Sequence, residues 1–324
     1  MSKALRDKAK AIAKEHGYLQ YMVERYLSLW GEEDTFRFIE ACEKPLRTAL
    51  RVNTLKSSVE NLVKRLSGKG VGLERIPWLG HGFYADFHGF SPGALLEHML
   101  GYYYVQGVPS MTAVAVLNPQ PGEIVADLAA APGGKTTHLS QLMKNQGTLV
   151  ALEQDRLRIS SLRSNIMRCA AENVMVYRGD AKKIDGLGLR FDKILLDAPC
   201  SGEGLIPLDP SRKTSKTMAD IRYCATVENE LLEAAVRNLK PGGEMVYSTC
   251  TIAPEENEYI VDDILRRFPE IRVQPIELEF GTPGYTEPYG VSLDESLVQA
   301  RRFLPHQHGT EGFFICKLRK EGGT

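Results

Sequence analysis

From about Pro121 onward, short apolar runs alternate regularly with segments of helical periodicity. The runs that predict strands cover residues 124–129, 149–153, 174–177, 193–197 and 244–249. The predicted helices begin at Lys135, Arg156 and Met218. Strands joined through helices pair in parallel, because a parallel pair needs a crossover connection. The pattern therefore predicts an α/β fold with a doubly wound, Rossmann-like and mostly parallel sheet.

Two smaller regions precede this sheet. Residues 1–43 have helical periodicity, and Met1 to Lys14 is typical of an amphipathic helix rather than of an export signal. Residues 44–98 alternate between predicted strands at 46–52, 73–76 and 82–85 and one helix over 57–66, capped by Ser57 or Ser58. We expect a helical region (1–43), a small α+β unit (44–98) and the main α/β domain (99–324). The small unit resembles an RNA-recognition fold without its aromatic strand motif.

Composition and local charge indicate the compartment and the kind of partner to expect for this chain. No apolar stretch in the 324 residues approaches the ~18 needed to span a membrane. Six scattered cysteines without CxxC pairs argue against a disulfide framework and against a zinc or other metal site, so we expect a reducing, cytoplasmic compartment. The net charge is −1, but residues 44–75 carry eight lysines and arginines against two glutamates. That segment fits a phosphate backbone about as well as it fits an ordinary solvated surface.

The turn from Asp127 to Thr136 follows the first strand of the main domain. In open α/β sheets the ligand lies beyond the carboxyl ends of the strands, and Gly133 and Gly134 let a ligand approach the backbone there. Ala129 stands where a phosphate-binding GxxxxGK loop requires glycine, and the dinucleotide-binding GxGxxG is absent. The turn alone is a weak signal.

Two acids sharpen the prediction of a ligand. Glu153 ends the second strand, where a carboxylate accepts the hydroxyls of a ribose, and Asp180 follows the third strand, within reach of an adenine amine. Each acid alone is more often a solvated residue or a helix cap. Their order along the sheet indicates an adenosine-containing ligand, and S-adenosylmethionine fits better than NAD because the turn is not built for a pyrophosphate.

Two cysteines end successive predicted strands. Cys200 closes Asp197-Ala198-Pro199-Cys200, and Cys250 closes Ser248-Thr249-Cys250. Neighbouring strand ends lie roughly 5 Å apart. A lone cysteine at a strand end is usually a small core residue, but proline and glycine take Cys200 out of the regular ladder.

Two thiols at one strand edge suit methylation of a pyrimidine at carbon. Carbon 5 of cytosine becomes nucleophilic when a thiolate adds at carbon 6, and a base must then remove the carbon-5 proton. One cysteine would attack and the other assist elimination, while Asp197 holds the ring at N3. We expect Lys135 or the helix N-termini to lower the pKa of the thiols. Enzymes that methylate exocyclic amines carry Asn/Asp-Pro-Pro-Tyr/Phe at this place instead of Asp-Ala-Pro-Cys.

Motifs between residues 101 and 319 resemble the Nol/Nop/Sun family of RNA 5-methylcytosine methyltransferases. The resemblance rests on Tyr104-Val105-Gln106, Pro119-Gln120-Pro121-Gly122, Asp127 to Thr136, Asp197 to Gly204, Lys240-Pro241-Gly242-Gly243, Tyr247 to Cys250, Pro254 to Glu258 and Gly312-Phe313-Phe314. Two departures are Glu228, where relatives often carry glutamine, and Pro109, within a segment that usually has Asp-x-Ala-Ser.

The resemblance implies residue roles that the spacing left open. Cys250 would be the nucleophile and Cys200 the residue that assists product release, with Asp197 and Lys135 completing the catalytic set. S-adenosylmethionine would be bound by Ala129, Ala130, Ala131, Pro132, Gly133, Gly134, Lys135, Glu153, Arg158, Asp180 and Asp197.

The partner expected from the sequence is RNA. Arg212, Lys213 and Lys216, in the loop after Cys200, are placed to guide it toward the site. Transfer RNA is favoured because the chain is compact, with ribosomal RNA as the competitor and a non-catalytic ribosome-assembly factor as the alternative class. The target base must leave its stack to react. We expect a monomer, and a helper protein stays open.

Overall fold

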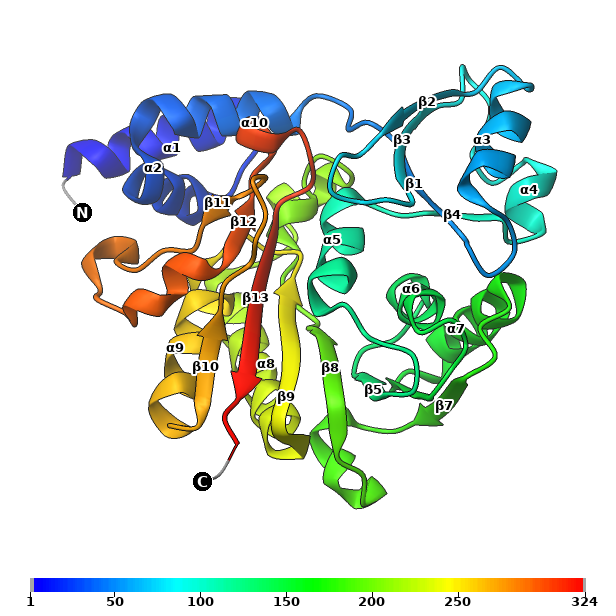
Figure 1. Cartoon of the computed structure of the whole chain (residues 1–324). Coiled ribbons are helices and arrows are strands. Elements are labelled where there is room, and N and C mark those ends of the chain that lie inside the picture. The colour runs from blue at the N-terminus through cyan, green and yellow to red at the C-terminus, as the bar shows by residue number, and fades with distance from the viewer. Residues whose placement is uncertain (1–2, 323–324) are drawn as a thin grey trace.

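The structure is a computed structural model that describes residues 3–322 (Figure 1). Within these residues the central sheet has nine strands in the order β11-β12-β13-β9-β8-β5-β6-β7, with β10 paired to β13. Five strands are parallel: β5 (Ile124–Asp127), β6 (Thr148–Glu153), β7 (Val174–Arg178), β8 (Phe191–Asp197) and β9 (Leu239–Thr249). The predicted parallel α/β sheet is confirmed. The strand order reverses between β5 and β8, and this is where such sheets bind ligands.

The other end of the sheet is antiparallel and was not predicted. β13 (Phe313–Lys320) pairs with β9, and β10 (Ile271–Gln274) and β12 (Arg301–Phe303) flank β13. β11 (Thr282–Pro283) pairs with β12, and the 3₁₀ turn Pro288–Gly290 follows it. The sheet is therefore parallel only in the half that carries the predicted site.

Helices cover both faces of the sheet. α5 (Val108–Leu117), α6 (Gly134–Leu142) and α7 (Arg156–Cys169) lie on one face, and α8 (Met218–Asn238) and α9 (Glu258–Arg267) lie on the other. α6 and α8 begin within one residue of their predicted starts because their first turns carry local signals, a glycine pair and a Thr217–Asp220 capping box. No helix in the described part of the chain is long and apolar enough to cross a membrane.

The small unit is a four-stranded antiparallel sheet. Its elements are β1 (Ala49–Val52), α3 (Val59–Ser67), β2 (Gly72–Arg75), β3 (Gly82–Asp86), α4 (Leu96–Met99) and β4 (Tyr103–Val105), with the strand order β2-β3-β1-β4. This is the split βαβ arrangement. Its fourth strand follows residue 98. One face packs on α3, whereas Ala49 on the other face packs against Val108 and Met111 of α5. The main domain thus covers part of the sheet face that an RNA-recognition fold leaves open.

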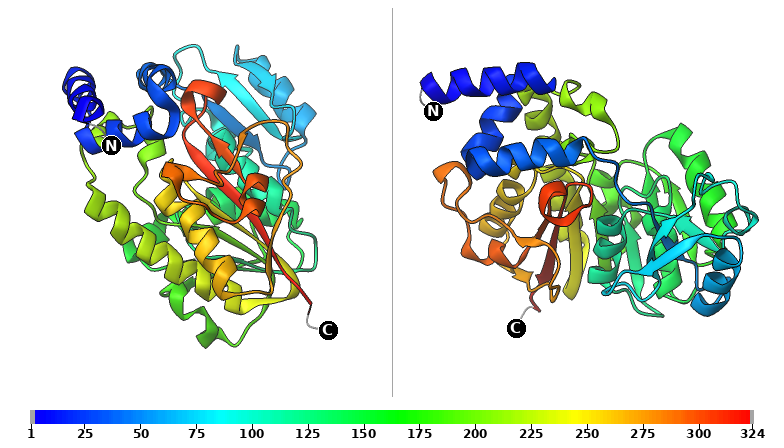
Figure 2. Two further views of the ribbon diagram at one scale, coloured as in Figure 1. Left: turned by 90° about the vertical axis from the view of Figure 1, so that its left-hand side faces the viewer. Right: turned by 90° about the horizontal axis from the view of Figure 1, so that it is seen from above.

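The N-terminal helices α1 (Lys3–His16) and α2 (Gln20–Cys42) pack against each other, and α2 is bent at Gly31, where φ is 74°. Met1 and Ser2 of the expected first helix lie outside the described residues. Tyr26 and Phe38 share a core with Ile206, Ile252 and Leu304 of the main domain, and α10 (Pro305–His308) packs on α2. The helix pair and the small unit both lie above the carboxyl ends of the parallel strands (Figures 1 and 2).

Candidate active site

The structure brings the two predicted thiols into contact. β8 and β9 are neighbours, and Cys200 and Cys250 follow their carboxyl ends with the two Sγ atoms 3.1 Å apart. A backbone hydrogen bond from Gly204 N to Cys250 O, 3.0 Å long, holds the two following loops together. The strand pairing therefore produces the thiol pair that the sequence predicted from spacing.

The expected lowering of the thiol pKa is wrong for Cys200. Its hydrogen bond with Cys250 and its burial raise the pKa of Cys200 well above the usual value. The charge of Lys135 does not act on the thiols alone, because its Nζ forms an ion pair with Asp197 Oδ2 at 2.6 Å. Cys200 therefore holds its proton in this arrangement.

Asp197 lies between a cation and a hydroxyl. Its Oδ2 accepts from Lys135, and its Oδ1 accepts from Ser248 Oγ at 2.9 Å. Burial alone would lower the pKa of Lys135, but the Asp197 carboxylate outweighs burial and raises it. Lys135 and Asp197 both line the same small pocket, so this ion pair faces the space beside the thiol strands.

Two pockets adjoin at Ala129 along the carboxyl edge of the sheet. The larger pocket has a volume of about 570 Å³ and contains the two acids predicted to bind adenosine. It is lined by Leu128, Ala129, Glu153, Gln154, Asp155, Arg158, Gly179, Asp180, Ala181, Lys182, Pro199, Tyr223, Val227 and Leu231. The smaller, about 240 Å³, is lined by Tyr104, Val105, Gln106, Gly107, Ser110, Ala129, Ala130, Ala131, Pro132, Gly134, Lys135 and Asp197. Of the predicted cofactor residues only Gly133 is absent from both linings.

The residues present suit an adenosine ligand with an amino-acid tail. Glu153 is 6% exposed at the end of β6, where it accepts from the backbone of Ala131 and of Asp155. Arg158 donates to Ala131 O at 2.6 Å and lines the larger pocket, so it supports the turn, and its contact with the cofactor stays a prediction. Asp180 caps the 3₁₀ helix Ala181–Leu187 and also lines the larger pocket, and its contact with an adenine stays a prediction. Because the carboxylates lie in the larger pocket and the backbone turn in the smaller, the two together fit S-adenosylmethionine.

Gly133 shapes the turn rather than lining it. It is the N-cap of α6 with φ of 106°, a conformation that favours glycine, and a Cβ there would come within 3.2 Å of the Leu162 side chain. The glycine therefore lets α6 begin where its N-terminus faces the smaller pocket.

Several lining residues were missed from the sequence. Tyr104, Gln106 and Ser110 come from β4 and the start of α5, and Tyr223 and Val227 come from α8. Residues 223, 227 and 231 are spaced by one helical turn each, so the sequence could have indicated that they share one face of α8. Tyr104 and Gln106 lay in a motif of the resemblance but carried no assigned role.

Two buried glutamates lie beneath the thiols. Glu256 accepts from Ser201 N and Ser201 Oγ, both at 2.6 Å, and from Thr251 Oγ1 at 2.8 Å. Glu228 in α8 is fully buried, and neither carboxyl oxygen has a hydrogen-bond partner among the described residues. Burial raises the pKa of Glu228 to about 10, so this residue is a neutral acid at pH 7. That state explains how glutamate occupies a place where glutamine is common.

The basic loop after Cys200 is held by the protein itself. Arg212 donates to Ser201 O at 3.2 Å, and Lys213 pairs with Glu43 and donates to His16 O at 3.3 Å. Both side chains bind the chain's own atoms, and their guidance of RNA stays a prediction. Lys213 fastens the loop to the ends of the N-terminal helices, and Arg212 fastens it to the segment that follows Cys200.

This sheet order and these pockets define the S-adenosylmethionine-dependent methyltransferase class of fold. A family model described as 16S rRNA methyltransferase RsmB/F matches residues 114–319, and one described as the N-terminal domain of 16S rRNA methyltransferase RsmF matches residues 20–108. The chain belongs to this RsmB/F family, and the recognition of the Nol/Nop/Sun family from its motifs is confirmed.

Individual relatives agree with the family. A 28S rRNA (cytosine-C(5))-methyltransferase of Mus musculus is 37% identical over 316 residues, which are 96% of this chain and 40% of that protein. The solved structure of a methyltransferase homolog from Pyrococcus horikoshii is 43% identical with a TM-score of 0.88, covering 99% of this chain and all of the other. NSun6 from Pyrococcus horikoshii, solved with the S-adenosylmethionine analogue SFG, is 29% identical with a TM-score of 0.82, covering 93% and 97%. The chain spans between 39% and 60% of the length of the curated relatives it matches.

Proposed function

We propose that this chain is an S-adenosylmethionine-dependent RNA cytosine-5 methyltransferase. The observation that carries the proposal is the pair of thiols 3.1 Å apart beside the Lys135–Asp197 ion pair, at the edge of the sheet that holds both pockets. A fold that only bound RNA would not need two adjacent thiols at this edge.

The chain's own residues divide the work of binding the cofactor. Glu153 would hold the ribose hydroxyls, Asp180 the adenine amine, and residues 129–135 the amino-acid end. When bound, S-adenosylmethionine supplies an electrophilic methyl group on a sulfonium. The N-terminus of α6 and Lys135 would favour the carboxylate of the methionine part.

Cys250 would act on the cytosine ring as the nucleophile. Its thiolate forms the bond to carbon 6, which makes carbon 5 nucleophilic toward the methyl group, while Asp197 faces N3 of the ring. Removal of the carbon-5 proton then restores the double bond between carbons 5 and 6 and expels Cys250. Cys200 would assist this last step, since its sulfur lies against Cys250.

Ribosomal RNA is the substrate that we propose, because the family descriptions and the mouse relative name it. Transfer RNA was favoured only because the chain is compact, and that preference has no support among these relatives. The six free cysteines suit the proposed cytoplasmic setting.

The exposed side of α1 would contact the RNA backbone. Lys3, Arg6, Lys10 and Lys14 recur at helical spacing, all are exposed, and none forms an ion pair within the described part of the chain. Unpaired cations on one helix face are what a phosphate backbone requires.

The test uses wild-type protein, Cys200→Ala, Cys250→Ala and the double variant with both substitutions, each incubated with unmodified ribosomal RNA, transfer RNA and labelled S-adenosylmethionine. We expect methyl transfer to ribosomal RNA by the wild type, a covalent RNA adduct on a denaturing gel for Cys200→Ala, and no adduct for the double variant. Methyl transfer that survives Cys250→Ala would exclude the nucleophile assignment. No transfer by the wild type would favour the assembly-factor alternative.

A further inference from the structure

A buried arginine of the N-terminal helix pair contacts both loops that carry the thiols. Arg25 in α2 is 9% exposed, and its Nη1 lies 3.0 Å from each carboxyl oxygen of Glu203, three residues after Cys200. Its Nη2 lies 2.9 Å from Oε2 of Glu255, five residues after Cys250. One guanidinium therefore joins the Cys200 loop to the Cys250 loop.

The rest of the contact leaves little freedom. Tyr26 donates to Glu203 Oε1 at 2.7 Å, so two adjacent residues of α2 hold the same carboxylate. Gly204 is confined as well, because a Cβ there would lie 2.1 Å from Gly312 O and 2.8 Å from Cys250 O. The Cys200 loop is therefore fixed on one side by α2 and on the other by the Cys250 loop.

The charges of this cluster depend on one another. Burial alone would lower the pKa of Arg25, but the carboxylates of Glu203 and Glu255 outweigh burial and raise it. Breaking a buried ion pair by removing one partner is strongly destabilising, because it leaves a charge without compensation. Loss of the Arg25 guanidinium would leave two carboxylates facing each other between the thiol loops, and the loops would move apart.

We propose that Arg25 is a positioning residue that sets the spacing of Cys200 and Cys250, so that the N-terminal helix pair completes the active site. The proposal rests on the proposed function and deepens it. Arg25 touches neither thiol, and its effect passes through Glu203 and Glu255. The separation of the thiols matters for the second half of the reaction, in which Cys200 assists the release of Cys250.

The experiment compares wild type, Arg25→Met, Arg25→Lys and Arg37→Met. Arg37 is the matched control, because it lies on the same helix but its side chain is 62% exposed and pairs with the surface residues Glu33 and Asp34. Arg25→Lys keeps one buried charge but loses the planar guanidinium that binds both carboxylates. It replaces Arg25→Met in the test if Arg25→Met does not fold. Thermal melts and S-adenosylmethionine binding by calorimetry report on the fold and on the cofactor site.

With ribosomal RNA as substrate, we expect kcat to fall at least tenfold in Arg25→Met and less in Arg25→Lys, while KM for RNA changes less than twofold. The covalent adduct should accumulate on denaturing gels, because release is slowed more than attack. A rise in KM with kcat unchanged would overturn the proposal, since it would mean that α2 only binds RNA.

A second readout needs no RNA and keeps the proposal separate from the proposed function. Diamide accepts two electrons and two protons from a pair of thiols that are in contact and joins them as a disulfide. We expect the Cys200–Cys250 bond, mapped by mass spectrometry, to form at least fivefold more slowly in both Arg25 variants than in Arg37→Met and wild type. Equal rates in all four proteins would exclude a positioning role, whether or not the chain methylates RNA.

Discussion

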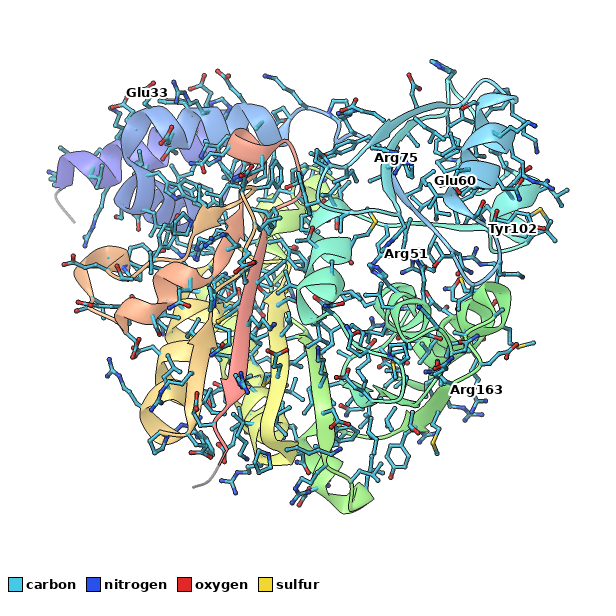
Figure 3. All side chains as sticks on the ribbon, in the orientation of Figure 1. Glu33, Arg51, Glu60, Arg75, Tyr102 and Arg163 are labelled. Atoms are coloured by element: carbon cyan, nitrogen blue, oxygen red, sulfur yellow. The ribbon has the colours of Figure 1, made fainter. Side chains whose placement is uncertain are left out.

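The two N-terminal units each send one buried arginine toward the site, and the two arginines differ in their partners. Arg25 of the helix pair lies between two carboxylates at the thiol loops. Arg51 of the small sheet, labelled in Figure 3, is fully buried. It donates to Gln106 Oε1, Gly134 O and Thr137 Oγ1 at 2.9, 2.7 and 2.8 Å, and it pairs with no carboxylate among residues 3–322. Burial opposes both charges. At Arg25 the carboxylates outweigh burial and raise the pKa, whereas burial lowers the pKa of Arg51 to about 10.

The difference shows that the two units brace different halves of the site. The helix pair contacts the loops of Cys200 and Cys250 through an ion cluster whose members depend on one another. The small sheet contacts the first turn of α6 through neutral acceptors, next to the backbone that would hold the cofactor. Damage to one unit should therefore affect thiol chemistry, and damage to the other should affect cofactor binding.

The strongest way to break this comparison is Arg51→Met. The substitution leaves the buried acceptors of Gln106 and Gly134 without their charged donor, at a cost of about 2–3 kcal/mol of folding stability. Without the arginine the α6 backbone next to the cofactor would shift. We expect S-adenosylmethionine affinity to fall about tenfold, which corresponds to a loss of about 1.4 kcal/mol of binding free energy. Calorimetry measures the affinity, and the diamide rate should stay at the wild-type value.

The control is Arg75→Met, which removes an exposed cation of the same sheet (Figure 3). Unchanged affinity in Arg51→Met would contradict the proposal that the small unit supports the cofactor half of the site.

A smaller effect is expected from the surface charges of the two units. In the small unit Arg47 pairs with Glu74, and Arg65 and Lys69 pair with Glu97. In α1, by contrast, Arg6, Lys10 and Lys14 form no ion pair with any described residue. Changing Arg6, Lys10 and Lys14 to glutamine should make the plot of log affinity for RNA against log salt shallower by about 2.

The matched variant for that measurement changes Arg47, Arg65 and Lys69 to glutamine. It removes the same formal charge from the small unit and should leave the slope nearly as in wild type. Filter binding at several salt concentrations gives both slopes. A larger loss of slope in the small-unit variant would mean that the basic segment 44–75, rather than α1, contacts the RNA backbone.

The smallest effect concerns Glu228, a buried carboxyl without a partner, in contrast to the paired Glu203. Between its ordinary pKa of 4.5 and about 10, the folded chain keeps a proton on Glu228 that the unfolded chain releases, so stability falls as pH rises. Glu228→Gln removes this dependence. Urea unfolding at pH 6, 7 and 8 should show the variant gaining on wild type by at most about 1.4 kcal/mol per pH unit. Parallel pH dependence in both proteins would mean that Glu228 is ionised in the folded state.

Local signals account for what could be predicted from the sequence. The strands β5 to β9 have continuous apolar runs, and the turns after them carry glycine, proline and the acids, so both the parallel sheet and the thiol pair followed from short segments. The strands β10 to β13 were missed because they are short or join the sheet only through antiparallel pairing with β9.

Long-range pairing accounts for the rest. Residues 44–75 were counted as a basic surface, but Glu97 lies outside that window and neutralises two of its cations. The pKa of Cys200 depends on a sulfur 50 residues away, and the contacts of Arg25 join residues 178 and 230 positions apart. No pattern within a few turns of Arg25 marks it as different from Arg37.

The same separations have a consequence for how the chain becomes active as it is made. Gly312 N donates to Gly204 O at 2.8 Å, so the Cys200 loop is completed by a residue next to β13, while its other support is α2, near the start of the sequence. Closing loops of this length costs conformational entropy before any contact is gained, which makes such contacts late events in folding. During synthesis α2 leaves the ribosome long before β13. Both cysteines are therefore translated before every support of their loops can form, and the Cys200 loop gains its last support late in folding.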